Sequence, residues 1–206
     1  MKKIKILSLL FCVVMLVAAC HDDEEGPIIP QPREQVGRTV LVYIVGDNGV
    51  NELSDLFKTN FEDMKEGMKE VDYSKCNLVV YSEMVNDVPR LVSLKKQNGK
   101  VVADTLFTYS EQNPLAKEVM SSVISQAVSY FPADSYGFVF LSHSSSWVPA
   151  TNDANSRSIG YYRRTQMNIP DFHDVLLSSF PRPLKFILFD SCSMQAVEVA
   201  YELRDC

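Results

Sequence analysis

Residues 184–192 read Leu-Lys-Phe-Ile-Leu-Phe-Asp-Ser-Cys, a nearly continuous apolar run that ends abruptly in polar and small residues. Such a run predicts a strand that is buried on both faces of a sheet. Three further runs have the same form, at residues 39–45, 77–81 and 136–141. Helical patterns with one apolar face alternate with them, at residues 52–71, 115–131, 168–180 and 196–203. The alternation predicts an α/β fold with a mostly parallel central sheet covered on both faces.

A hairpin is the one antiparallel feature that we expect. Residues 90–94 and 101–108 flank Gln97-Asn98-Gly99-Lys100, and Asn-Gly accepts the positive φ angles of a tight turn. In parallel sheets, ligands and chemistry collect beyond the carboxyl ends of the strands. We therefore expect three loops, at residues 46–49, 142–147 and 190–194, to share one edge of the sheet.

Length and composition narrow the class of protein. The chain has 206 residues, 46% of them hydrophobic, which is enough for one folded domain with a proper core. Its net charge of -6 argues against a general nucleic-acid binder, which needs a basic face for phosphate contacts.

The first 20 residues have the form of an export signal. A basic head with three lysines precedes the apolar run Ile6–Ala19, which is shorter than the roughly 20 residues that a membrane-spanning helix needs. Leu16-Val17-Ala18-Ala19-Cys20 resembles the bacterial lipobox, in which the cysteine is lipidated and becomes the new N-terminus. We expect a signal peptide at 1–19, lipid attachment at Cys20, and an exported protein anchored to the bacterial outer membrane and exposed at the cell surface. An ordinary signal peptide with a chance cysteine is the alternative.

Residues 20–36 are expected to form a tether between Cys20 and the folded domain. The segment holds the acidic run Asp22-Asp23-Glu24-Glu25 and several prolines, a composition that cannot bury a core. Without residues 1–19 the chain carries 17 basic and 26 acidic groups, a net charge of -9. We place the folded domain at residues 37–206.

Cys192 and His143 are the candidate pair for nucleophilic chemistry. Each follows the end of a predicted buried strand, and an imidazole beside a thiol can accept its proton or hold the thiolate as an ion pair. We also expect a helix to follow Cys192, with an N-terminus that favours the thiolate. The remaining cysteines, Cys76 and Cys206, show neither a disulfide framework nor zinc spacing. A buried structural cysteine and an ordinary loop histidine remain the alternative interpretation.

Two stretches, Phe138–His143 and Ile187–Asp205, resemble the clostripain family of cysteine peptidases, and Thr39–Tyr43 with Gly46-Asp47-Asn48 resembles its first strand and turn. The resemblance implies a caspase-like three-layer sandwich and a His/Cys dyad that cleaves peptide bonds after Arg or Lys in protein or peptide substrates. It implies no cofactor, although calcium dependence is known in the family, and we can assign no calcium ligands and no other metal site.

The resemblance also implies a role for each site residue. Cys192 would be the nucleophile and His143 the general acid/base. The backbone N–H groups of Ser144 and Cys192 would form the oxyanion hole. Asp190 would bind the basic P1 side chain, since a carboxylate in a part-buried pocket is a suitable partner for guanidinium. A strand-end or helix-cap carboxylate is the alternative for Asp190.

The sequence departs from the family in two main respects. Ser144 stands where relatives have glycine, and a positive φ there would strain a serine by about 1 kcal/mol or more. The chain also stops 14 residues after Cys192, whereas relatives continue, so we expect the sheet to be incomplete at its C-terminal end. The chain would then be a fragment of a longer protein or a truncated product. A catalytically inactive homologue that binds peptides or partners at the cell surface is the alternative function.

Overall fold

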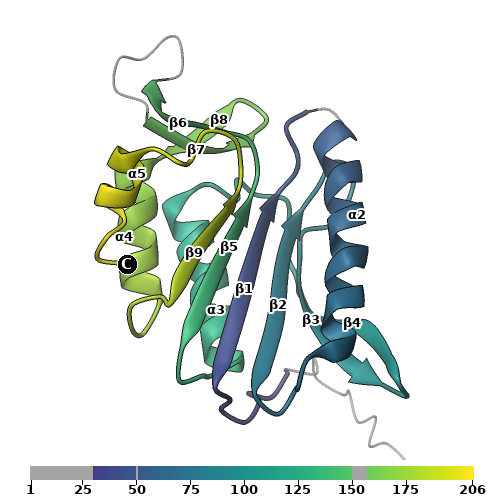
Figure 1. Cartoon of the computed structure of the whole chain (residues 1–206). Helices are drawn as coiled ribbons and strands as arrows, with labels where there is room; N and C mark the ends of the chain where they lie inside the picture. Colours follow the sequence, from purple (N-terminus) through teal and green to yellow (C-terminus); the bar gives the residue numbers. More distant parts are fainter. Residues whose placement is uncertain (1–29, 50, 150–156) are drawn as a thin grey trace, which may run out of the picture. The chain divides into compact units, whose positions relative to one another are not determined.

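The apolar runs and the hairpin form one sheet of six strands. The computed structural model describes residues 30–49, 51–149 and 157–206. The strands of this sheet are β1 (Arg38–Val45), β2 (Cys76–Glu83), β3 (Arg90–Gln97), β4 (Lys100–Thr108), β5 (Tyr136–Leu141) and β9 (Phe186–Asp190). Their order is β4-β3-β2-β1-β5-β9 (Figure 1).

Four strands of this sheet are parallel, as the sequence predicts. β2, β1, β5 and β9 run in one direction, and β3 and β4 are antiparallel to their neighbours. Asn98 and Gly99 join β3 to β4 with φ angles of 50° and 77°, so the expected hairpin turn is confirmed. Because β1, β5 and β9 are parallel, the segments that follow them all leave the sheet at the same side, beyond the carboxyl ends of the strands.

Helices cover both faces of the sheet and complete three layers. Alternate side chains of β1 explain how: Val42 and Ile44 pack against α2 (Asn51–Gly67), while Leu41 and Tyr43 belong to the core beneath α3 (Lys117–Tyr130) and α4 (Ile169–Ser179). A short 3₁₀ helix, Met68–Glu70, follows α2. The core beneath α3 and α4 is strongly aromatic, with ring contacts among Tyr43, Phe138, Phe140, Phe172 and Phe180.

A second, small antiparallel sheet lies in the region for which we expected a loop. Its strands are β6 (Ser144–Pro149), β7 (Arg157–Tyr162) and β8 (Thr165–Asn168), in the order β6-β7-β8. The assignment of residues 142–147 to a loop was therefore wrong from Ser144 onward, while Ser142 and His143 lie between strands as expected. The strand Ser144–Pro149 carries no long apolar run, and its ladder partner Arg157–Tyr162 is separated from it in the sequence.

β9 forms an edge of the main sheet, and one of its faces is uncovered. Phe186 and Leu188 are 37% and 50% exposed on the side where α2 covers β1 and β2, whereas Ile187 and Phe189 pack toward the core on the other side. The last helix, α5, spans only Val197–Glu202.

Most of the expected signal and tether, including Cys20, lies outside the described residues. The end of the expected tether is described and contacts the domain: the Arg33 N–H donates to the Tyr130 carbonyl at 2.9 Å, and Val36 forms a bridge with Ala133. In the ranges that the structure covers, none of the helices combines the length and apolar character that crossing a membrane requires.

Candidate active site

The pairing of β5 with β9 places His143 and Cys192 at equivalent positions beyond the carboxyl ends of these two strands. Leu141 pairs with Asp190 in parallel register, and each candidate residue follows its strand end by two positions. Both side chains are exposed, and Cys192 is a free thiol. The two residues are separated by 49 positions in the chain, and the pairing of β5 with β9 brings the ends of their strands together.

The segment after Cys192 differs from our expectation. The helix α5 matches the apolar pattern at residues 196–203, but it begins at Val197, five residues after Cys192, and not directly after the cysteine as we expected. Ser193 has a φ of 62°, which directs the chain into a turn, and Met194 is buried in the core. The N-terminus of α5 is therefore not at Cys192.

Ser144 has an ordinary extended backbone. It opens β6 and pairs with Ile159 of β7, and it is not among the non-glycine residues with positive φ. The condition for strain in a serine at this position, a positive φ, is therefore not met in the structure. Its hydroxyl accepts a hydrogen bond from the Gly160 N–H at 3.3 Å.

Asp190 faces a hollow between β9 and α2. The hollow has a volume of about 620 Å³, and three of its lining residues are polar: Asn60, Asp63 and Asp190. The Asn60 amide donates to the Asp190 carboxylate at 3.2 Å. Its other walls are apolar, including Val139 and Leu188. Carboxylates beside apolar walls suit a long side chain that ends in a cation. The helical pattern of 52–71 contained no sign of a role for Asn60.

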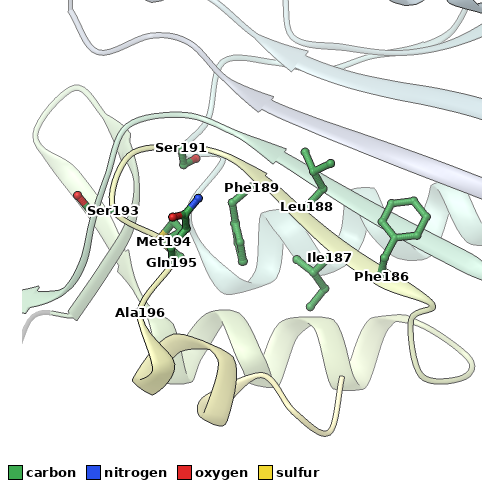
Figure 2. A pocket seen from close by; sticks show the side chains of 9 residues that line it. All are labelled: Phe186, Ile187, Leu188, Phe189, Ser191, Ser193, Met194, Gln195 and Ala196. Carbon is green, nitrogen blue, oxygen red and sulfur yellow. The ribbon is translucent and has the colours of Figure 1, made fainter.

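A larger groove follows the free edge of β9 toward the segment after Cys192. It has a volume of about 910 Å³. Figure 2 shows its lining, with Phe186–Phe189 on the strand and Ser191, Ser193, Met194, Gln195 and Ala196 on the segment that follows. The groove therefore connects the exposed apolar face of β9 with the neighbourhood of the candidate nucleophile.

A cluster of charged side chains holds the β7–β8 hairpin against the end of β1. Arg163 is at the hairpin turn with a φ of 53°; its Nε donates to the buried Asp47 carboxylate at 2.9 Å, and its guanidinium also pairs with Glu111. Glu83, at the end of β2, is buried beside this cluster. Burial, and next the nearby Asp47 charge, raise the pKa of Glu83 to about 7. Sequence reasoning missed this cluster because its members are far apart in the chain.

The other two described cysteines have no evident part in the site. Cys206 is buried, and burial raises the pKa of its thiol to about 11. Cys76 is half-buried at the start of β2. Within the described part of the chain, no three His, Cys, Asp or Glu side chains are grouped so that they could hold a metal ion.

Comparisons with known proteins identify the family. The model of the clostripain family matches residues 42–206. A secreted cysteine protease from Bacteroides thetaiotaomicron, solved in complex with an irreversible peptide inhibitor, is 43% identical with a TM-score of 0.72; the match covers 82% of this chain and 46% of that one. An inactive zymogen protease from Parabacteroides distasonis is 33% identical with a TM-score of 0.70, over 84% of this chain and 47% of that one.

A third solved structure matches a shorter part of the chain. A B. fragilis cysteine protease chain is 42% identical with a TM-score of 0.52, over 57% of this chain and 97% of that one. No curated protein matches the chain. The chain spans about half the length of the first two solved relatives. Since the family model matches well over half of the sequence, and the α/β sheet matches the caspase-like protease structures, this chain belongs to the clostripain family of cysteine peptidases.

Proposed function

We propose that this chain carries the catalytic dyad of a cysteine endopeptidase that cleaves peptide bonds after Arg or Lys. The observation that carries the proposal is the register of β5 and β9, which sets His143 and Cys192 two residues beyond the paired ends Leu141 and Asp190. The exposed, free thiol of Cys192 supports it, and so does the 43% identical relative that was solved with an irreversible peptide inhibitor.

The proposed reaction begins when the Cys192 thiolate attacks the scissile carbonyl carbon. The imidazole of His143 takes the thiol proton and later gives it to the leaving amine, so that the peptide bond breaks and an acyl-enzyme remains. Water then attacks the acyl-enzyme, releasing the new carboxylate and restoring the thiol. The backbone N–H groups of Ser144 and Cys192 are proposed to stabilise the oxyanion, and the unstrained backbone of Ser144 is compatible with that role.

The hollow in front of Asp190 is proposed to hold the P1 side chain. The Asp190 carboxylate, which already accepts a hydrogen bond from the Asn60 amide, would bind a guanidinium or ammonium group. The apolar walls would contact the methylene stem of the P1 side chain. A second carboxylate, Asp63, lines the same hollow and adds to its preference for a cation. The substrate is therefore proposed to be a protein or peptide with a basic P1 residue.

We propose that the protein is exported and lipid-anchored through Cys20 to the outer membrane. The basic and apolar start of the chain and its lipobox-like residues support this location, and the most similar of the reported relatives is described as secreted. Treatment of intact cells with protease, followed by mass analysis of the released protein, tests surface exposure. Loss of membrane association in Cys20→Ala tests the anchor.

Intact mass measured before and after treatment with irreversible peptidyl probes tests the peptidase proposal. The natively expressed protein is treated with probes that carry Arg, Lys, Asp or norleucine at P1. We expect one adduct with the Arg and Lys probes and little with the other two. Cys192→Ala should lose the adduct, and His143→Ala should form it much more slowly. Cys76→Ala is the matched control, because Cys76 lies at the opposite end of the sheet at the start of β2.

Asp190→Asn separates the specificity from the chemistry. The variant keeps the shape of the side chain and its contact with Asn60, but it loses the charge. We expect a preference for the Arg probe over the norleucine probe to fall by about tenfold or more, because a charge-assisted pair becomes a neutral one. An unchanged preference would refute the assigned P1 role of Asp190. Absence of any Cys192-dependent adduct would instead favour the inactive, peptide-binding homologue.

A further inference from the structure

Ser142, the residue directly before His143, joins three elements at the base of the proposed dyad. The side chain is buried, and it belongs neither to β5 nor to β6. Its hydroxyl donates a hydrogen bond to the Val45 carbonyl at the end of β1, at 2.9 Å. The same oxygen accepts a hydrogen bond from the Tyr161 N–H of β7, at 3.1 Å. Its backbone N–H points to the Asp190 carbonyl at the end of β9, at 3.4 Å.

These contacts replace strand pairing where the regular ladders stop. The β1–β5 register ends at Ile44 and Leu141, and the β5–β9 register ends at Leu141 and Asp190. Beyond Leu141 the chain leaves the sheet, and the Ser142 contacts continue its attachment to β1 and β9 for one more residue. They also attach it to β7 of the second sheet. The backbone directly before His143 is therefore attached to three strands, β1, β7 and β9.

We propose that Ser142 is a positioning residue that holds His143 in place beside Cys192 through its hydroxyl. This inference rests on the proposed function. It adds a residue to which that function assigns no contact with substrate. Proton transfer needs donor and acceptor at about 2.6–3.2 Å, and a displacement of about 1 Å can cost ~10²-fold in rate. A buried hydroxyl that bonds simultaneously to β1 and β7 is well suited to prevent such a displacement.

The experiment follows the alkylation of Cys192 by iodoacetamide as a function of pH, with the mass of the Cys192 peptide as the readout. This neutral probe reports the thiolate directly, so it works whether or not the chain turns over a substrate. In the wild-type protein we expect alkylation at pH 6 to be faster than in His143→Ala, because an imidazole beside the thiol promotes its reaction.

Ser142→Ala should move this pH profile upward, toward that of a free thiol. We expect the rate at pH 6 to fall about tenfold or more, because a displaced His143 no longer holds the thiolate. Ser142→Thr keeps the hydroxyl on the β carbon and should restore the profile. The unfolding midpoint of each variant, measured in urea, shows that the protein is folded under the conditions of labelling.

Ser54→Ala is the matched control. Ser54 is also buried, and its hydroxyl has the same pattern of contacts: it donates to the Gly46 carbonyl at 3.2 Å and accepts from the Val85 N–H at 3.0 Å. Ser54 is on α2, and its hydroxyl joins the segments that follow β1 and β2 instead of the segment that holds His143. The variant should lose a similar amount of stability and leave the pH profile unchanged, which separates positioning from general stabilisation.

The outcomes distinguish the inference from the function on which it rests. If His143→Ala shifts the profile but Ser142→Ala behaves like Ser54→Ala, the dyad is supported and the positioning role of Ser142 is refuted. Failure of Ser142→Thr to restore the profile refutes it as well. If the wild-type profile is that of a free thiol and His143→Ala does not change it, the proposed function fails.

Discussion

Replacing Glu83 by Gln should make the protein more stable at neutral and alkaline pH. Glu83 is 2% exposed at the end of β2, and among the described residues its Oε2 atom has no hydrogen-bond partner. Burial disfavours the charged form, the nearby Asp47 carboxylate adds to the effect, and the Asp47 N–H and Arg163 oppose it. The result is a pKa raised from 4.5 to about 7. Glutamine has the shape of the neutral acid and cannot ionise.

The size of the effect follows from linkage between protonation and folding. Between pH 4.5 and 7, the unfolded chain releases the Glu83 proton while the folded protein keeps it, so stability falls as pH rises through this window. Above pH 7 the carboxylate ionises in both states and the loss is complete. Since one pKa unit corresponds to about 1.4 kcal/mol, a shift of about 2.5 units amounts to about 3 kcal/mol at pH 8. Glu83→Gln should remove this loss.

Urea unfolding followed by circular dichroism, at several pH values from 4.5 to 8, measures the prediction. We expect the free energy of unfolding of Glu83→Gln to match that of the wild type near pH 4.5 and to exceed it progressively up to pH 8. Glu62→Gln is the control, because Glu62 is at the surface of α2 and pairs with Lys65. Its difference from the wild type should be small at every pH.

Two results would refute the reasoning. A constant difference between Glu83→Gln and the wild type across this range would mean that the carboxyl does not titrate in the window. A variant that is less stable than the wild type at pH 8 would mean that the ionised carboxylate is stabilising, through Arg163, by more than its burial costs.

Three further substitutions test the fold. Gly160→Ala should lower the free energy of unfolding, measured in urea, by at least about 1 kcal/mol, because Gly160 has a φ of 74° and a Cβ would lie 2.5 Å from Leu115; an unchanged free energy would show that the hairpin relaxes freely. Phe172→Ala should cost about 3–5 kcal/mol, measured by the same unfolding, since its ring is fully buried among other rings. Leu188→Lys should reduce concentration-dependent association of residues 31–206 in sedimentation velocity, because a charge on the exposed edge strand opposes edge-to-edge pairing; equal association in both proteins would contradict this.

Strands and helices with a strong local pattern could be predicted from the sequence. The run at 136–141 became β5 with the same bounds, and the Asn98-Gly99 turn has the positive φ angles that its residues favour. The second sheet could not be predicted. Ser144–Pro149 and Thr165–Asn168 are short and carry no period of their own, so their extended form depends on pairing with β7.

The candidate site was predicted in part for the same reason. His143 and Cys192 could be named because each ends a recognisable strand, whereas the turn at Ser193 and the late start of α5 replaced the helix that we expected after Cys192. Asn60, Ser142 and Arg163 went unrecognised. Each acts through a contact with a residue at least 19 positions away, and no local spacing encodes such a contact.

Local patterns in this sequence were thus enough for the class of fold, the strands of the main sheet with the helices that cover it, and a candidate pair of residues for nucleophilic chemistry, because periodicity and strand ends are properties of short segments. The tertiary structure alone showed that β5 and β9 are neighbours in a register that brings Leu141 opposite Asp190. It also showed that the Ser142 hydroxyl joins two sheets and that Glu83 is buried beside Asp47. These features arise from hydrogen bonds and burial between distant segments, which form only when the whole core is packed.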